Sequence, residues 1–255
     1  MRTEALSFVR CPACGSELEF LGRPEGREFI EGELRCSSCH RSFRVRHGIP
    51  DFRLPDCFKT PNKLQKALYD VYAPFYDRLE AILGKMTGFS EPELREEIAS
   101  FLELRSDSSV LEICVGTGGN LPYIRARTRG PIAGLDISEE MLKICQEKVD
   151  HMRLWPVDLF LGCAEYLPFK PGAFDRVLIG GGISYFGDVR RALSEAARVT
   201  ADGGLVVVFE QVTLLERALG RADLPLRNLP SNLSPLERRW LFGHKFYLLK
   251  LVKQV

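Results

Sequence analysis

The alternation of strand-sized apolar runs with helix-sized segments over residues 109–255 limits the fold of this chain more than any other feature. We expect strands at 110–115, 132–136, 158–161, 174–179, 205–209 and 246–252, separated by helices at 121–127, 139–149 and 188–199. Repeated strand–helix units predict a mostly parallel sheet with helices on both faces. The fold class is therefore α/β, with a doubly wound, Rossmann-like sheet.

Residues 1–55 carry two CxxC pairs, formed by Cys11 with Cys14 and by Cys36 with Cys39. This spacing suits a tetrahedral Zn²⁺ ion held by four thiolates, and a pair of redox dithiols is the alternative. A region of this size with only short apolar runs needs a metal or disulfides to stay folded. Four protein thiolates leave no open coordination position, so the zinc would be structural. His40, directly after Cys39, is a possible substitute ligand.

The remaining four of the eight cysteines are scattered along the chain: Cys57, Cys114, Cys145 and Cys163. We interpret the cysteine pattern as metal binding rather than as a disulfide framework. The N-terminus lacks the layout of a signal peptide, and no apolar run approaches the ~20 residues of a membrane span. These features predict a cytoplasmic protein.

Residues 56–105 are predicted to be helical. A first helix has an apolar face of residues three or four positions apart, namely Leu64, Leu68, Val71, Phe75 and Leu79. A second helix is expected to begin near Glu91. We therefore divide the chain into a zinc ribbon at 1–55 and a domain at 56–255, of which 56–105 form a helical cap. Residues 211–245 contain three spaced prolines and are expected to be irregular, as a lid or a contact surface.

A glycine loop follows the first strand of the predicted sheet, with Gly116, Gly118 and Gly119. Ligands of doubly wound sheets bind at the carboxyl ends of strands, where glycines let the backbone approach them. Asp136 ends the second strand and can accept hydrogen bonds from two ribose hydroxyls. Leu121 stands where a dinucleotide-binding loop has Gly or Ala, which counts against NAD. An ordinary tight turn is the alternative for the loop alone.

Four stretches in order resemble class I S-adenosylmethionine-dependent methyltransferases of type 11, nearest the quinone-biosynthesis C-methyltransferases. They are residues 112–118, 134–142, 162–169 with 174–175, and 195–199 with 202–204. The resemblance covers about residues 65–210. It implies the methyltransferase form of the Rossmann-like sheet and S-adenosylmethionine as the methyl donor.

The resemblance also implies roles for individual residues. The residues expected to bind the donor are Glu112, Gly116, Gly118, Asp136, Ile137, Met141, Cys163 and Ala164. Asp136 would bind the ribose, Glu112 the amino group, and the last four residues would lie against the adenine. Two positions depart from the family pattern. Cys114 replaces a usual Gly, and the Cys163 thiol replaces an Asp that accepts from the adenine amino group.

The sequence offers no clear general base, and none of its four histidines lies at the ligand edge of the sheet. The segment around Tyr72 and Tyr76 resembles family segments that cover the donor and wall the acceptor pocket; packing of an amphipathic helix is the alternative. Tyr185, beyond the glycines 180–182, is a further candidate for the acceptor wall. No catalytic residue is assigned.

The ribbon resembles the Trm112-like group, which is often fused to or partnered with methyltransferases. We weigh three functions. The first is methyl transfer to a small, apolar or aromatic molecule. The second is methyl transfer to RNA gripped by the basic ribbon residues Arg35, Arg41, Arg44, Arg46 and Arg53; the third is a non-catalytic donor-binding module. A net charge of +1 argues against binding nucleic acid by bulk charge but leaves room for a basic patch. No pattern reports an oligomer interface.

Overall fold

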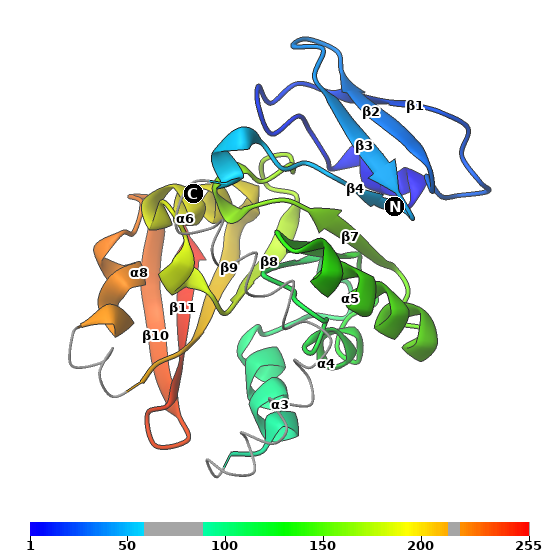
Figure 1. The fold of residues 1–255 in the computed structure, drawn as a ribbon. Coiled ribbons are helices and arrows are strands. Elements are labelled where there is room, and N and C mark those ends of the chain that lie inside the picture. Colours follow the sequence, from blue (N-terminus) through cyan, green and yellow to red (C-terminus); the bar gives the residue numbers. More distant parts are fainter. Residues whose placement is uncertain (59–88, 214–219, 255) are drawn as a thin grey trace.

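The computed structural model describes residues 1–58, 89–213 and 220–254 (Figure 1). The predicted first helix of the cap, with Tyr72 and Tyr76, lies outside these residues. The described part contains a four-stranded sheet near the N-terminus and a seven-stranded sheet that forms the body of the molecule.

The larger sheet has the order β10-β11-β9-β8-β5-β6-β7. Five strands are parallel: β5 (Val110–Ile113), β6 (Ile132–Asp136), β7 (Val157–Leu161), β8 (Phe174–Gly180) and β9 (Thr200–Gln211). The antiparallel strands β11 (Phe246–Lys253) and β10 (Leu233–Leu241) complete one edge. The strand order reverses between β5 and β8, which is where doubly wound sheets bind their ligands. The predicted α/β fold is confirmed.

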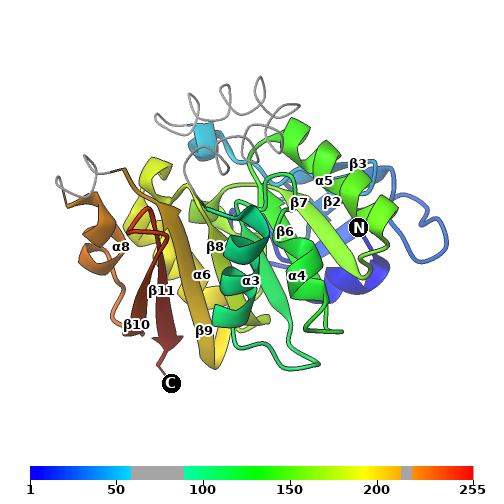
Figure 2. The ribbon, with the colours of Figure 1, turned by 90° about the horizontal axis from the view of Figure 1, so that it is seen from below.

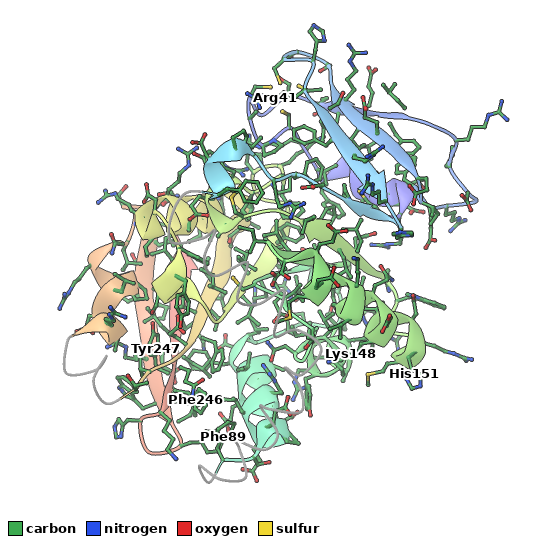
Figure 3. The ribbon with its side chains drawn as sticks, viewed as in Figure 1. Arg41, Phe89, Lys148, His151, Phe246 and Tyr247 are labelled. Carbon is green, nitrogen blue, oxygen red and sulfur yellow. A yellow bond between two sulfur atoms is a disulfide. The ribbon has the colours of Figure 1, made fainter. Side chains whose placement is uncertain are left out.

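Helices cover the sheet on both faces (Figure 2). On one face lie α3 (Glu91–Phe101), α4 (Leu121–Arg125) and α5 (Glu139–Met152), and α6 (Val189–Val199) lies on the other. Ser90, Ser138 and Asp188 each accept a backbone N–H at the start of a helix, which explains where α3, α5 and α6 begin. Just before α3, Phe89 meets Phe246 of β11 with ring centroids 4.9 Å apart (Figure 3).

The smaller sheet is antiparallel and contains β1 (Leu18–Leu21), β2 (Gly32–Cys36), β3 (Ser42–Arg46) and β4 (Ile49–Pro50). A 3-10 helix, η1 (Thr3–Ser7), precedes it, and a second, η2 (Pro55–Phe58), follows. Strand β3 alternates between exposed and buried residues, so Phe43 and Val45 point inward while Arg44 and Arg46 face solvent.

This small sheet covers part of the larger one. Between β7 and β8, the described chain forms only a short 3-10 helix, η4 (Ala164–Tyr166), and no α-helix shields the sheet there. The ribbon takes that place. Phe52 stacks on Phe160 of β7 at 6.4 Å between ring centroids, and Phe8 meets Phe174 of β8 at 5.7 Å. Buried residues of both sheets therefore belong to one hydrophobic core.

Polar contacts fix the same junction. The Phe52 N–H donates to the Leu161 carbonyl at 2.7 Å, so the chain after β4 extends the edge of β7. The Arg2 guanidinium pairs with the buried carboxylate of Asp158 in β7 at 2.6 Å. Hydrogen bonds and aromatic packing act at the same junction, and together they fix the position of the ribbon on the larger sheet.

The expectation that residues 211–245 are irregular is wrong. This stretch contains α8 (Leu224–Arg227) and the nine-residue strand β10. Pro225 lies in the first turn of α8, where the missing N–H costs nothing. Pro235 lies at a register shift of an edge strand, a position that tolerates proline. The expected strand at 205–209 also begins earlier, at Thr200, and passes through Gly203 with φ +71°.

Replacing Phe52 by Ala tests whether the ribbon and the larger sheet unfold together. Phe52 is fully buried, so the change is expected to destabilise the chain by about 3–5 kcal/mol. Chemical denaturation measures this, with Leu236→Ala as the control because that side chain is 57% exposed and its loss costs little. A Phe52→Ala protein whose larger sheet unfolds at the wild-type midpoint would contradict the shared core.

Candidate functional site

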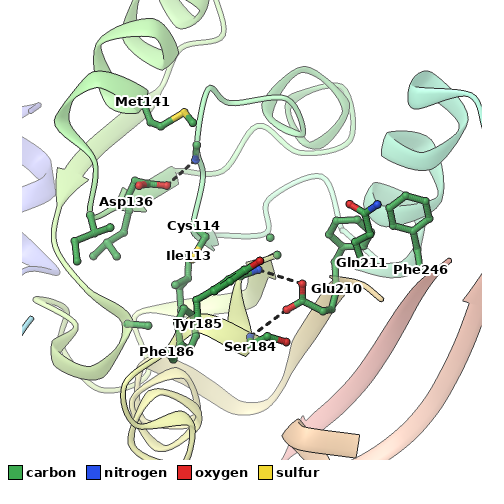
Figure 4. Close-up of a pocket in the computed structure, with 18 of the residues that line it drawn as sticks. Ile113, Cys114, Asp136, Met141, Ser184, Tyr185, Phe186, Glu210, Gln211 and Phe246 are labelled. Atoms are coloured by element: carbon green, nitrogen blue, oxygen red, sulfur yellow. Dashed lines mark hydrogen bonds between the residues drawn. The ribbon is translucent and has the colours of Figure 1, made fainter. Parts of the chain in front are cut away.

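A cavity of about 470 Å³ opens at the carboxyl ends of the parallel strands (Figure 4). Its walls include the loop after β5, the end of β6 with the start of α5, the turn after β7, and the ends of β8 and β9. Seven of the eight predicted donor-binding residues line it directly or lie in its loop: Gly116, Gly118, Asp136, Ile137, Met141, Cys163 and Ala164. The eighth, Glu112, lies behind the glycine loop in β5.

The glycine loop has three residues with left-handed backbone conformation. Cys114, Gly116 and Gly118 have φ values of +60°, +54° and +78°. Glycine adopts this conformation most easily, and Cys114 adopts it in place of the glycine that the family resemblance leads us to expect. At Gly118 a side chain is also excluded by space, because an added Cβ would lie 2.7 Å from Cys145 Sγ. Leu121 fills the neighbouring space and is fully buried.

Asp136 ties the glycine loop to the start of α5. Its Oδ2 accepts from the Gly116 N–H at 2.9 Å, and its Oδ1 accepts from the Ser138 N–H at 2.9 Å. The carboxylate is half-buried at the cavity wall. A carboxylate at the cavity wall is a group of the kind that accepts from two adjacent hydroxyls.

Glu112 is a buried carboxyl whose two oxygens differ. Its Oε1 accepts from Asn120 Nδ2 at 2.6 Å, whereas its buried Oε2 has no hydrogen-bond partner among the described residues. Burial raises the pKa of Glu112 to about 7, against the smaller opposing effects of Asn120 and Arg95. A bound cation or ammonium group would satisfy this oxygen. Gly180 gives the carboxyl its room, since a Cβ there would lie 2.8 Å from Oε1.

Acidic side chains gather around Cys114 in the cavity wall. Burial raises the pKa of the Cys114 thiol well above its ordinary value, and four carboxylates raise it further: Asp136, Glu210, Glu165 and Glu112. The described lining contains one cationic side chain, Arg95, which pairs with Glu91 and donates to Asn120 Oδ1 at 3.3 Å. Such a site favours a positively charged ligand.

Cys163 is not the free thiol that the sequence analysis expected. Its sulfur forms a disulfide with Cys57 of η2, across 106 residues of sequence. The interpretation of these two cysteines as separate, scattered thiols is therefore wrong. The two cysteines meet because the ribbon packs on the larger sheet and so brings η2 to the turn after β7. No local sequence pattern predicts this contact. Cys163 still lines the cavity beside Ala164.

The far end of the cavity is aromatic. Phe209 and Phe246 stack with centroids 5.7 Å apart, and Phe89 lies against Phe246. Tyr185 lies in a 3-10 helix, η5 (Ile183–Tyr185), lines the opposite side and is 46% exposed. Sequence reasoning singled out Tyr185 but missed this phenylalanine cluster, because its members are far apart along the chain.

The four CxxC cysteines lie together in the ribbon. Their sulfur atoms all lie within 4.8 Å of one another, with Cys11 and Cys36 buried and Cys14 and Cys39 exposed. Two of the separations are 3.7 and 3.4 Å, near the roughly 3.8 Å between thiolates around tetrahedral zinc. The N–H groups of Ser38 and Cys39 point at Cys36 Sγ. The donor set fits a Zn²⁺ ion.

The raised pKa of Glu112 predicts a pH dependence of stability. The folded chain keeps this proton up to about pH 7, whereas the unfolded chain releases it near ~4.3. The native state thus binds more protons between these values, and the free energy of unfolding falls as pH rises through them, by ~3 kcal/mol. Denaturation at pH 5 and pH 8 measures the fall. Glu112→Gln is expected to remove the share of this fall that Glu112 causes, whereas the exposed control Glu147→Gln keeps it. If the free energy of unfolding falls equally with pH in all three proteins, Glu112 is not its source.

Two protein families match this chain. The ubiE/COQ5 methyltransferase family matches residues 61–222, and the Trm112p-like family matches residues 3–48. A demethylmenaquinone methyltransferase of Lactiplantibacillus plantarum is 35% identical over 151 residues, covering 57% of this chain and 61% of that protein. One from Bacillus cereus (strain AH187) is 29% identical over 148 residues, covering 57% and 62%. The chain thus spans about three fifths of the length of these curated relatives.

Solved structures share the fold at low sequence identity. The [4+2]-cyclase SpnF has a TM-score of 0.61 and 16% identity, covering 75% of this chain and 96% of its own. One chain of a complex between the Haloferax volcanii Trm112 methyltransferase activator and a methyltransferase has a TM-score of 0.59 and 15% identity. The match covers 73% of this chain and 98% of that chain. A geranyl diphosphate C-methyltransferase of Streptomyces coelicolor has a TM-score of 0.55 and 16% identity, and the match covers 65% of this chain and 79% of that chain. The family match over more than half of the sequence is decisive: this chain belongs to the ubiE/COQ5 methyltransferase family.

Proposed function

We propose that this chain binds S-adenosylmethionine in the cavity and transfers its methyl group to a small aromatic or apolar acceptor. The observation that carries the proposal is the pair of carboxyl groups at the glycine loop, half-buried Asp136 and buried Glu112. Glu112 lies in β5 and Asp136 ends the neighbouring strand β6, so one ligand could place vicinal hydroxyls at Asp136 and a cationic group at Glu112.

Each end of the donor has matching residues. Asp136 accepts from the ribose hydroxyls, and Ile137 and Met141 form an apolar seat for the adenine with Cys163 and Ala164 at its edge. Gly116 and Gly118 let the loop backbone approach the methionine portion. The Oε2 atom of Glu112, which has no partner among the described residues, accepts from the amino group, directly or through water.

The donor supplies an activated methyl group, so the residues of the chain mainly have to align donor and acceptor. Alignment of two reactants in one site accounts for several kcal/mol of a barrier. The carboxylates around Cys114 stabilise a positive charge at the centre of the cavity. The phenylalanine cluster gives the far end an apolar lining.

An aromatic acceptor suits the remaining space. Phe89, Phe209 and Phe246 present ring faces and edges to it, and Tyr185 lies on the other side. The curated relatives are named demethylmenaquinone methyltransferases, which supports a small-molecule acceptor. Tyr72 and Tyr76 remain predictions for the same pocket.

We further propose that the ribbon holds a structural Zn²⁺ ion through Cys11, Cys14, Cys36 and Cys39, and that the ribbon ends near residue 55. In the Haloferax volcanii complex an activator and a methyltransferase are partners; here the ribbon would support the catalytic sheet within one chain. No helix in the described residues is long and apolar enough to cross a membrane. A cytoplasmic location stays a proposal.

RNA is a second candidate acceptor. A groove between the ribbon and α5 is lined by Arg44, Arg46, Arg53 and Lys143, with Asp51 and Glu139 as its acids. Arg53 pairs with Asp51 and Lys143 with Glu139, so much of this charge is compensated within the chain. The aromatic cavity therefore favours the small acceptor. Methyl transfer to RNA that weakens steeply with salt would reverse this ranking.

Donor binding tests the proposal directly. Calorimetry is expected to show binding of S-adenosylmethionine by the wild-type chain and roughly 10- to 100-fold weaker binding by Asp136→Ala, which loses charge-assisted hydrogen bonds to two hydroxyls. Asp150→Ala, on the exposed side of α5, is the control and keeps wild-type affinity. No binding of S-adenosylmethionine or S-adenosylhomocysteine at millimolar concentration would exclude every function considered above. If the chain binds S-adenosylmethionine but transfers no methyl group to an aromatic acceptor or to RNA, the non-catalytic donor-binding module is the function that remains.

Removal of zinc tests the ribbon. Elemental analysis is expected to find one zinc per chain, and a chelator is expected to lower the melting temperature of the whole chain, because both sheets share one core. Cys39→Ser lowers the zinc content and the melting temperature together, whereas its neighbour Ser38→Ala changes neither. A zinc-free chain with the wild-type melting temperature would contradict a structural metal.

A further inference from the structure

The Cys57–Cys163 disulfide connects the end of the ribbon to the wall of the candidate donor site. Cys57 lies in η2, whereas Cys163 follows β7 and lines the cavity. Their Cα atoms lie 5.8 Å apart, although 106 residues separate them along the chain. The bond therefore joins two parts of the fold that the sequence keeps apart, and methyl transfer as proposed above does not use it.

The turn that holds Cys163 is tied to the residue proposed to bind the ribose. The Gly162 N–H donates to the Asp136 carbonyl at 2.8 Å, and the Asp136 side chain accepts from the Gly116 N–H at 2.9 Å. Cys163 and Ala164 both line the cavity. A shift of the backbone at Cys163 would thus move groups that face the adenine and also the residue that faces the ribose.

Noncovalent contacts bring the exit of the ribbon to the same wall. Asp51 forms a parallel bridge with Leu161, and the Phe52 N–H donates to the Leu161 carbonyl at 2.7 Å. The Arg53 guanidinium approaches the Ile137 carbonyl at 3.5 Å, just beyond the end of β6. The disulfide extends this attachment to η2, so the ribbon and the donor site are joined by a covalent bond as well as by hydrogen bonds.

The disulfide can be reached from the cavity. Cys57 is fully buried and Cys163 is only 4% exposed, so neither sulfur lies open on the outer surface. Of the two, Cys163 is the one that belongs to the described cavity lining. A small thiol that enters the cavity would therefore meet the Cys163 sulfur first. A bound donor would block its path, because the adenine is proposed to lie against Cys163 and Ala164.

A second cysteine in the cavity wall is a poor competitor for exchange with this bond. Cys114 also lines the cavity, but burial raises the pKa of its thiol well above the ordinary value. Only the thiolate form attacks a disulfide. Cys114 therefore stays protonated, and the pair formed by Cys57 and Cys163 exchanges with external thiols instead.

We propose that Cys57 is a positioning residue of the donor site, which acts through a reversible disulfide with Cys163. In the disulfide form the wall beside the adenine is already in place, so less ordering remains when the donor binds. In the dithiol form this wall is free to move, and the donor binds more weakly. The inference rests on the proposed function and adds a redox response of donor affinity. Disulfides in reducing compartments are mostly transient and often redox-sensing, which suits the cytoplasmic location proposed above.

The exchange balances with glutathione as the reductant. A glutathione thiolate attacks the Cys163 sulfur, the sulfur–sulfur bond breaks, and the electron pair leaves on Cys57, which takes up a proton. A second glutathione thiolate attacks the glutathione sulfur of the mixed disulfide. Cys163 leaves as a thiolate and takes up a proton, and glutathione disulfide forms. Oxidation of the two thiols by glutathione disulfide is the reverse of these steps.

The first test measures ligand affinity in both redox states. Calorimetry titrates S-adenosylhomocysteine into the zinc-loaded chain in oxidising and in reducing glutathione buffers. We expect binding roughly 5- to 20-fold weaker in the dithiol state, which is an ordinary size for coupling between two sites. Cys57→Ala binds like the reduced wild type in reducing buffer and does not gain the higher affinity in oxidising buffer. Phe58→Leu, an exposed neighbour in η2, is the control and responds like wild type. Circular dichroism checks that each variant is folded.

A second readout needs neither turnover nor a variant. Differential alkylation with peptide mass spectrometry measures how much of Cys57 and Cys163 is in the disulfide form across a series of glutathione buffers. Linkage requires saturating S-adenosylhomocysteine to shift the equilibrium constant of the pair towards the disulfide by the same factor as the ratio of affinities. The ligand is also expected to slow reduction of the bond, because it covers the cavity side of Cys163. A merely structural disulfide would show neither change.

The outcomes separate this inference from the proposed function. A chain that binds neither S-adenosylmethionine nor S-adenosylhomocysteine in either buffer contradicts the proposed function itself. Equal affinity of the verified disulfide and dithiol forms, or tighter binding by the dithiol form, overturns the role of Cys57 alone. A pair that stays fully reduced or fully oxidised throughout the glutathione series also overturns it, because the bond would then not be reversible.

Discussion

The aromatic contact between the ribbon and the sheet supports the rest of this structure. The connection from β7 to β8 lacks an α-helix, so Phe160 and its neighbours would face water on that side. Phe8 and Phe52 cover them. A ribbon of this size cannot supply its own stability from apolar burial alone, and the cluster of four cysteines offers a metal site that would add to it. The cysteine cluster, the ribbon and the larger sheet therefore depend on one another.

The same contact reaches the candidate donor site. The chain leaving the ribbon pairs Asp51 with Leu161, and the Arg53 side chain approaches the Ile137 carbonyl at 3.5 Å. The Cys57–Cys163 disulfide then joins this segment to the cavity wall. Anything that displaces the ribbon therefore disturbs the turn after β7 and the start of α5, which form one side of the cavity.

Buried carboxylates give the cavity its chemical character. Burial alone would favour their neutral forms, and neighbouring donors offset this to different degrees. Asp136 and Glu210 accept backbone N–H groups, whereas Glu112 has one amide partner and a pKa raised to about 7. The arrangement suits a cationic ligand and explains why a glycine is needed at 180, where a side chain would displace Glu112.

The sequence by itself determined the α/β sheet, the starts of most of its predicted elements, the zinc-type cysteine cluster and the residues around the glycine loop. Apolar periodicity, helix caps and short-range spacing encode these features, so they can be read from neighbouring residues. Only the tertiary structure decided that the ribbon replaces a helix on the sheet, that Cys57 meets Cys163, and that β10 pairs as an edge strand despite its proline. Glu210 and the phenylalanine cluster likewise belong to one cavity only after folding. These features depend on contacts between residues far apart in sequence, which arise from how complete surfaces fit together and leave no local signal.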